Sequence, residues 1–279
     1  MIVIVHAVVS LGMLVVLPLG LRLVSSGTTL RRWWWVAAVP GVLSLWLPRG
    51  PVSITLASIY FAGTGVLAIV GLFAAWRVLG EGRTGKAVAI ATAFGTPAIA
   101  ALALVAERAS YPLFGFKLSV LSLTVAHFHF AGFAAALVAF LVAGAVPGKA
   151  ADLASYSVPV GTFVVLLGFF VGDWLELVGA AILTAGMWLV GWCLLRLRAG
   201  ADRLTRVLLA TSGGVLAATM VLALSWALGH VVDTPYLPIE WMAATHGIAN
   251  ALGFALCGLL AFRRLDLAHD ANKADPVAA

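Results

Sequence analysis

Two histidines, His127 and His129, lie in the middle of an apolar segment that covers residues 116–146. The segment is long enough to cross a bilayer as a helix. An ionisable side chain without a partner is strongly disfavoured in hydrocarbon, so residues of this kind are candidates for a functional site. On a regular helix the two side chains point about 200° apart. We therefore expect one histidine to face a cavity and the other to face a neighbouring helix.

A second polar group occurs near the C-terminus, where His246 is followed four residues later by Asn250. This spacing places both side chains on one face of a helix. We predict that His127, His129 and His246 form a proton-handling core, because imidazole exchanges protons near neutral pH. Asn250 is predicted to position the substrate.

Carboxylates supply the candidate acids. Asp173 and Glu176 lie three residues apart at the start of an apolar run and share one helical face. We predict that these two residues are catalytic acids. The predicted substrate-binding residues are, besides Asn250, the side chains of Trp226, Tyr60, His6 and Glu107. For Glu107 a local ion pair with the adjacent Arg108 is a second interpretation.

The histidines have four competing interpretations. They can be buried hydrogen-bonding groups that hold helices together, or a proton-transfer site. They can be ligands of a metal or haem, although the i,i+2 spacing of His127 and His129 is poor for one metal and no HxxxH, HxxE or ExxH pair occurs. They can also form a substrate or ion site in a transporter. We predict no metal ligand and no cofactor.

Composition defines the broad class of the protein. The chain is 63% hydrophobic and 10% charged, whereas a soluble domain carries about 25% charged residues. Its apolar runs are continuous, so we predict an all-α, polytopic transmembrane helical bundle in the cell membrane. The net charge of +6 is explained by basic residues at the cytoplasmic face, and no nucleic-acid partner is expected. Nucleotide-binding motifs are absent, which argues against an ATP-driven pump.

The apolar runs predict about nine spans, at residues 2–24, 33–47, 52–79, 87–106, 116–146, 154–171, 174–197, 204–228 and 239–262. With the N-terminus outside, 14 of the 17 basic residues fall on the cytoplasmic side, which leaves Arg49, Arg108 and Lys117 outside. The C-terminus is then cytoplasmic. We expect one transmembrane domain over residues 1–262 and a polar, frayed cytoplasmic tail over residues 263–279.

Two motifs carry a resemblance to a known family. Residues 126–133 read AHFHFAGF and residues 245–254 read THGIANALGF. At these stretches the chain resembles the bacterial YndJ-like membrane proteins, and this resemblance implies a fold more than an activity. A role-level analogy also exists to the integral-membrane terpene cyclases, which protonate an epoxide or alkene with membrane-embedded carboxylates. No residue of those enzymes maps onto this sequence.

Three functions follow as hypotheses. The first is a membrane-embedded enzyme, of the terpene cyclase or isomerase kind, that acts on a lipophilic, prenylated or terpenoid-like substrate by acid–base chemistry. The second is a proton-coupled transporter or exporter of a small hydrophobic molecule. The third is a metal- or haem-dependent membrane oxidoreductase. The expected partners are the lipid bilayer and a lipophilic small molecule.

Overall fold

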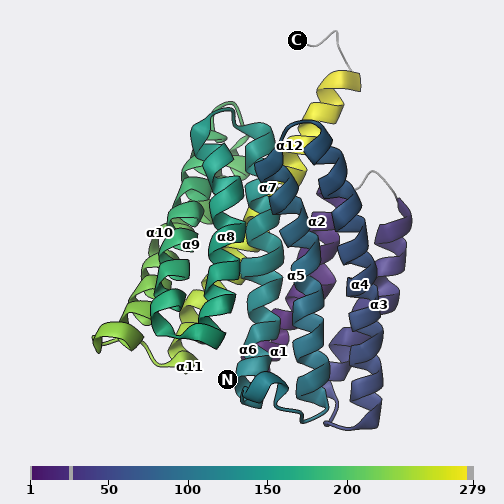
Figure 1. The fold of residues 1–279 in the computed structure, drawn as a ribbon. Coiled ribbons are helices and arrows are strands. Elements are labelled where there is room, and N and C mark those ends of the chain that lie inside the picture. The colour runs from purple at the N-terminus through teal and green to yellow at the C-terminus, as the bar shows by residue number, and fades with distance from the viewer. Residues whose placement is uncertain (1, 25–27, 275–279) are drawn as a thin grey trace.

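The computed structural model describes residues 2–24 and 28–274, and in these ranges every long element is a helix (Figure 1). Six long helices are uninterrupted: α3 (Thr28–Trp46), α4 (Pro51–Gly80), α5 (Thr84–Arg108), α8 (Lys149–Val171), α9 (Asp173–Arg196) and α10 (Arg203–Val232). A short 3₁₀ turn, η2 (Leu113–Gly115), precedes the fifth long helix.

Three further long helices contain turns of π-helix. The first is built of α1 (Ile2–Leu11), η1 (Gly12–Val16) and α2 (Leu17–Val24). The fifth is built of α6 (Leu118–His127), η3 (Phe128–Ala134) and α7 (Ala135–Ala145). The ninth is built of α11 (Ile239–Met242), η4 (Ala243–Gly247), η5 (Ala249–Leu256) and α12 (Cys257–Ala274).

Eight of these long helices, among the described residues, are long and apolar enough to cross a membrane. The chain is thus a multi-pass membrane protein. The second long helix, α3, is not one of the eight, although the sequence predicted about nine spans. Its first turns carry Arg31 and Arg32, and its apolar part contains Pro40 and Gly41, so its hydropathy is lower than that of the others. In the bundle α3 nevertheless packs along α4 (Figure 1).

Glycines bring α8 and α9 into backbone contact. Gly172 is the single residue between the two helices and has a φ of 141°, which lies in the region that favours glycine. Gly161 and Gly168 of α8 and Gly179 of α9 each face the backbone of the partner helix. Close approach through small residues is the usual mode of helix packing in membranes. The α8–α9 hairpin therefore presents Glu176, beside Gly168, in a fixed position.

The end of the bundle opposite the N-terminus is tied by Asp202. Its carboxylate accepts hydrogen bonds from the Leu204 and Thr205 amides and thus caps α10. Arg264 of α12 lies 3.2 Å from the same carboxylate. The hydrogen bond from the Thr205 hydroxyl, assisted by these neighbours, lowers the pKa of Asp202 to about 2. Asp202 therefore links the start of α10 to α12.

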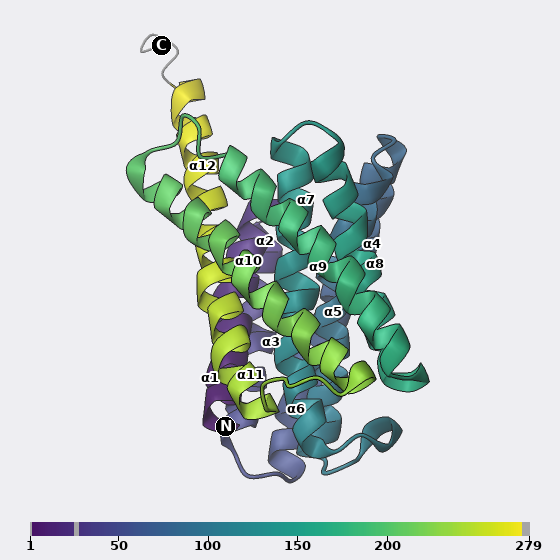
Figure 2. The same cartoon turned by 90° about the vertical axis from the view of Figure 1, so that its left-hand side faces the viewer.

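The C-terminal boundary differs from the expectation. The sequence predicted a frayed tail from residue 263, but α12 continues as a helix to Ala274. Residues 275–279 lie outside the described residues. Figure 2 shows α10 running obliquely across the bundle, close to α12 at one end and away from α11 at the other. The connection over residues 233–238 returns across that interval to α11.

Candidate functional site

A cavity of about 480 Å³ lies inside the bundle and is lined mainly by apolar and aromatic side chains. It is bounded by α1, α5, the α6–α7 helix, α8, α9, α10 and the last long helix. Its polar lining consists of a few side chains: Thr124, His127, Thr162, Glu176, His246 and Asn250. Apolar pockets with a small number of polar groups are typical of sites for small molecules.

The side chain of His127 faces this cavity. His127 is the last residue of α6, and its side chain is exposed although it lies inside the bundle, so the exposure is to the cavity. Its ring meets Phe128 edge to face, with ring centroids 5.9 Å apart. Within the described part of the chain, no hydrogen-bond or salt-bridge partner of His127 is present. The imidazole is therefore free to contact a molecule in the cavity.

His246 is held by a closed set of hydrogen bonds. Its Nδ1 lies 2.8 Å from the Thr219 carbonyl oxygen, which can only accept, so Nδ1 carries the proton. Its Nε2 then accepts from the Asn250 amide at 3.2 Å. The Asn250 Oδ1 in turn lies 3.0 Å from the Thr219 hydroxyl, which donates to it. Thr219 and Asn250 together fix the ring orientation and the tautomer of His246.

The two predicted acids are placed differently. Glu176 lines the cavity, half-buried, and has no salt-bridge or hydrogen-bond partner among the described side chains. Asp173 is exposed at the first position of α9 and does not line the cavity. Glu176 lies about 5 Å along its helix from the start, and His127 about 14 Å along α6, at 1.5 Å per residue. Both helices start at the end of the bundle where the N-terminus lies (Figure 1).

His129 points away from the cavity, toward α4. Its Nδ1 donates to the Val125 carbonyl at 2.7 Å, and its Nε2 accepts from the Tyr60 hydroxyl at 2.6 Å. Both side chains are buried, and Trp34 packs edge-on against the Tyr60 ring. The opposite orientations of His127 and His129 follow from their i,i+2 spacing. This pair satisfies its own polar atoms and joins α4 to the fifth long helix.

The π-helical turns coincide with the polar motifs. His129 lies in η3, His246 in η4 and Asn250 in η5. The segments η1, η3 and η5 contact one another inside the bundle. Where a Cβ would be on Gly12 of η1, the side chain of His129 is only 3.0 Å away. Turns of this kind occur often at functional sites. The π-helical turns therefore indicate, independently of the side chains, that a functional site lies near these residues.

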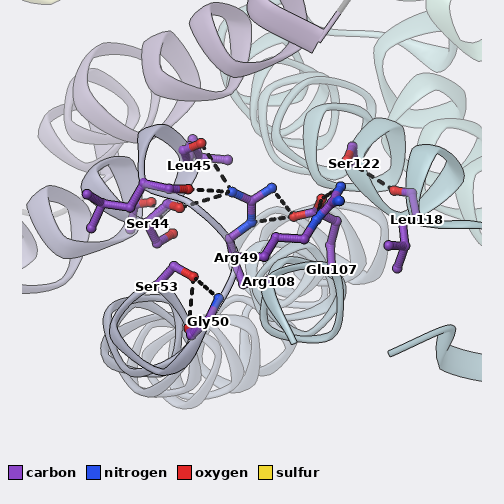
Figure 3. Close-up of polar contacts among 11 residues, drawn as sticks. Ser44, Leu45, Arg49, Gly50, Ser53, Glu107, Arg108, Leu118 and Ser122 are labelled. Atoms are coloured by element: carbon purple, nitrogen blue, oxygen red, sulfur yellow. Dashed lines mark hydrogen bonds and ion pairs between the residues drawn. The ribbon is translucent and has the colours of Figure 1, made fainter. Parts of the chain in front are cut away.

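Glu107 belongs to a buried ion cluster outside the cavity (Figure 3). Its carboxylate pairs with Arg108 and, at 2.6 Å, with Arg49. Arg108 also donates to the carbonyl oxygens of Ser44, Leu45 and Leu47 at 3.2–3.3 Å. These carbonyls end α3, so the cluster caps that helix and fixes it to α5. The ion pair expected between Glu107 and Arg108 is present.

His6 lies beside the C-terminal end of α3, which the ion cluster caps. Its ring packs edge-on against Trp46, with centroids 5.5 Å apart, and it does not line the cavity.

Trp226 lines the cavity beside the 233–238 connection. Its ring lies 4.2 Å from that of His230 and 6.2 Å from that of Tyr236, between ring centroids. Tyr236 also contacts Gly229, where a Cβ would collide with the tyrosine ring. The connection is thus folded back onto α10 by aromatic packing.

The structure divides the ten predicted site residues into two equal groups. One group lines the cavity: His127, His246, Glu176, Asn250 and Trp226. The other group lies elsewhere: His129, Asp173, Tyr60, His6 and Glu107. Sequence reasoning missed Thr219, whose only signal was a polar side chain in an apolar run, 27 residues from His246. Across residues 2–24 and 28–274, no group of three or more His, Cys, Asp or Glu residues could hold a metal ion.

Comparison with known proteins gives one match. A family model described as YndJ-like protein matches residues 7–254, a range that includes both histidine motifs and most of the bundle. No curated protein and no solved structure matches the chain.

Proposed function

The chain belongs to the YndJ-like protein family, and on that premise we propose that it is a membrane-embedded enzyme that isomerises or cyclises a lipophilic molecule by proton transfer. The observation that carries the proposal is the unpartnered imidazole of His127 in an apolar cavity that also contains the Glu176 carboxyl group. Among the described residues, neither side chain has a hydrogen-bond or salt-bridge partner that would explain its presence there. Two groups that can exchange protons in one apolar cavity suit acid–base chemistry on a lipophilic substrate.

The proposed chemistry needs no oxidant and no second substrate. Glu176 donates a proton to an alkene carbon or an epoxide oxygen, and an electron pair of the substrate forms the new bond to that proton. The resulting cation shifts or cyclises and loses a proton to His127. The product has the mass of the substrate, and the enzyme regains its initial state when the proton returns to Glu176. The aromatic lining of the cavity, including Trp226, stabilises a cationic intermediate.

His246 and Asn250 are proposed to shape the substrate site rather than to transfer the proton. Both side chains are held by hydrogen bonds that involve Thr219. They therefore present polar groups to a substrate in a fixed arrangement. His129 and Asp173, which the sequence placed in the catalytic core, have no role in this proposal because they do not line the cavity.

The orientation in the membrane is part of the same proposal. Basic residues favour the cytoplasmic side, and those near the helix ends at the C-terminal end of the bundle include Arg22, Arg83 and Arg203. We therefore propose that the N-terminus is outside, that the C-terminus is cytoplasmic, and that the protein lies in the cell membrane. In this orientation Glu176 is near the outer surface.

The test is a product assay with detergent-purified protein. The protein is incubated with a panel of prenylated molecules, polyenes and their epoxides, and products of unchanged mass are sought by chromatography and mass spectrometry. Wild type and the matched control Glu81→Gln are expected to form an isomer, because Glu81 lies between α4 and α5 and does not line the cavity. His127→Phe and Glu176→Gln are expected to form none while remaining folded. Absence of any isomer, together with proton-driven uptake of the same molecules into vesicles, would show that the protein is a transporter.

A further inference from the structure

A second hollow, of about 420 Å³, lies at the end of the bundle opposite the N-terminus. Its lining is Arg22, Arg31, Arg32, Trp35 and Arg263. These residues come from the end of α2, the start of α3 and α12. Helices α2 and α3 are consecutive in the chain, whereas α12 is remote in sequence and packs against α2. The hollow is separate from the histidine cavity, and it shares no lining residue with it.

Within the described residues, no salt bridge balances the charge of this hollow. Four guanidinium groups surround it, and none of them forms a salt bridge within the described residues. The acids that form salt bridges at this end pair with other arginines: Asp202 with Arg264, and Glu81 with Arg83. Like charges held together repel one another. An anion in the hollow would offset this repulsion.

The position of the arginines selects the kind of anion. Arg22 is two residues from the end of α2, and Arg263 directly follows the apolar stretch that ends at Phe262. Trp35 is exposed at the same level. Tryptophan and arginine are enriched where the hydrocarbon meets the headgroups, so the hollow lies at the depth of lipid phosphates. Basic hollows between membrane helices on the cytoplasmic side bind the headgroups of anionic lipids.

We propose that this arginine hollow binds the phosphate group of an anionic phospholipid. Guanidinium groups bind phosphate oxygens through paired, charge-assisted hydrogen bonds, and four of them suit a ligand with a full negative charge. The indole of Trp35 packs beside the glycerol and the first methylenes of the lipid. The bound lipid joins the first, second and last long helices at their cytoplasmic ends.

Native mass spectrometry of the full-length protein tests the proposal. Purified protein is titrated with phosphatidylglycerol or with phosphatidylcholine of the same acyl chains, and retained lipid is counted. Wild type is expected to retain phosphatidylglycerol preferentially. Arg22→Gln/Arg263→Gln is expected to bind it about tenfold more weakly or worse, because each basic residue near the surface contributes to anionic-lipid binding. The matched control Arg77→Gln/Arg83→Gln removes two arginines that do not line the hollow and is expected to change the affinity less than twofold.

Two further measurements complete the test. Arg22→Lys/Arg263→Lys keeps the charges and is expected to fold and to bind more weakly than wild type, since lysine cannot form the paired hydrogen bonds. Inorganic phosphate alone, measured by thermal shift, is expected to give no stabilisation at concentrations where the lipid does. The proposal is overturned if phosphatidylcholine is retained equally by wild type. It is also overturned if the control variant loses as much affinity as the Arg22/Arg263 variant, or if free phosphate binds as tightly as the lipid.

Discussion

His127 and His129 are separated by one residue, and we predict that they act independently. His129 forms a buried hydrogen bond with Tyr60, whereas His127 faces the cavity without a partner among the described residues. Tyr60→Phe removes the hydroxyl and leaves the His129 Nε2 without a donor. An unsatisfied buried group costs about 1–3 kcal/mol, but polar contacts between membrane helices average about 0.6 kcal/mol, because the unfolded chain finds other partners. We expect Tyr60→Phe to lower the unfolding free energy by about 1 kcal/mol.

The measurement is a double-mutant cycle on purified protein, unfolded reversibly in mixed micelles by increasing sodium dodecyl sulfate and followed by tryptophan fluorescence. Tyr60→Phe, His129→Ala and the double variant are expected to show a coupling energy of about 0.5–1 kcal/mol. The matched control is the cycle of Tyr60→Phe with His127→Ala. His127 points to the opposite side of its helix from His129, and so away from Tyr60. The effects of Tyr60→Phe and His127→Ala are therefore expected to add within about 0.3–0.5 kcal/mol.

Activity or ligand binding completes this prediction. His127→Ala is expected to abolish the function and to leave expression and unfolding near those of wild type, and His246→Ala to impair it through loss of the polar wall. If His127 couples to Tyr60 as strongly as His129 does, the orientation of the motif is wrong. If His127→Ala and His246→Ala both prevent folding, the histidines hold the bundle together and the catalytic interpretation fails.

Three other predictions concern the surroundings of the site. Glu107→Gln is expected to destabilise the protein by about 3 kcal/mol, because it leaves the buried Arg108 guanidinium without its carboxylate. Arg49→Gln changes the half-exposed partner and is expected to cost less than about 1 kcal/mol. Equal effects of the two variants in the unfolding assay would contradict the buried cluster. Gly132→Ala is expected to cost about 1–3 kcal/mol, because its Cβ would lie 2.6 Å from the Thr96 hydroxyl, whereas Gly95→Ala, with open space around it, is expected to be neutral or stabilising; a neutral Gly132→Ala would refute the close packing. The Asp202 carboxylate has a lowered pKa, so its contribution to stability is complete above the unfolded pKa near 4 and is lost as the pH falls toward 2. In Asp202→Asn the thermal stability is expected to change less with pH over that range. A pH profile identical to that of wild type would exclude the contribution.

The limits of sequence reasoning are clear at particular residues. The length of an apolar run is a property of one segment, so eight spans were predicted to within a few residues. Among the described long helices, α3 alone is not apolar enough to count as a span. The spacing of Asp173 and Glu176 placed both on one helical face at the start of α9. Which of them lines the cavity depends on how α8 and α10 pack around that face. Tyr60, His6 and Glu107 were predicted to bind the substrate, but none of them lines the cavity. Their actual partners, His129, Trp46 and Arg49, come from distant segments that no local pattern identifies.

The π-helical turns explain which local predictions survived. A regular helix turns about 100° per residue, and a π-helix with about 4.4 residues per turn turns about 82°. Over two residues the difference is about 36°, so His127 and His129 oppose each other in either geometry. Over four residues it is about 72°, and His246 remains within hydrogen-bonding reach of Asn250. Over the fourteen residues of η4, Ile248 and η5 the difference exceeds half a turn, so the direction in which α12 faces cannot be calculated from its own sequence. The relative orientation of the polar side chains can thus be predicted within each motif. Their assembly into one cavity depends on backbone geometry that only the packed bundle defines.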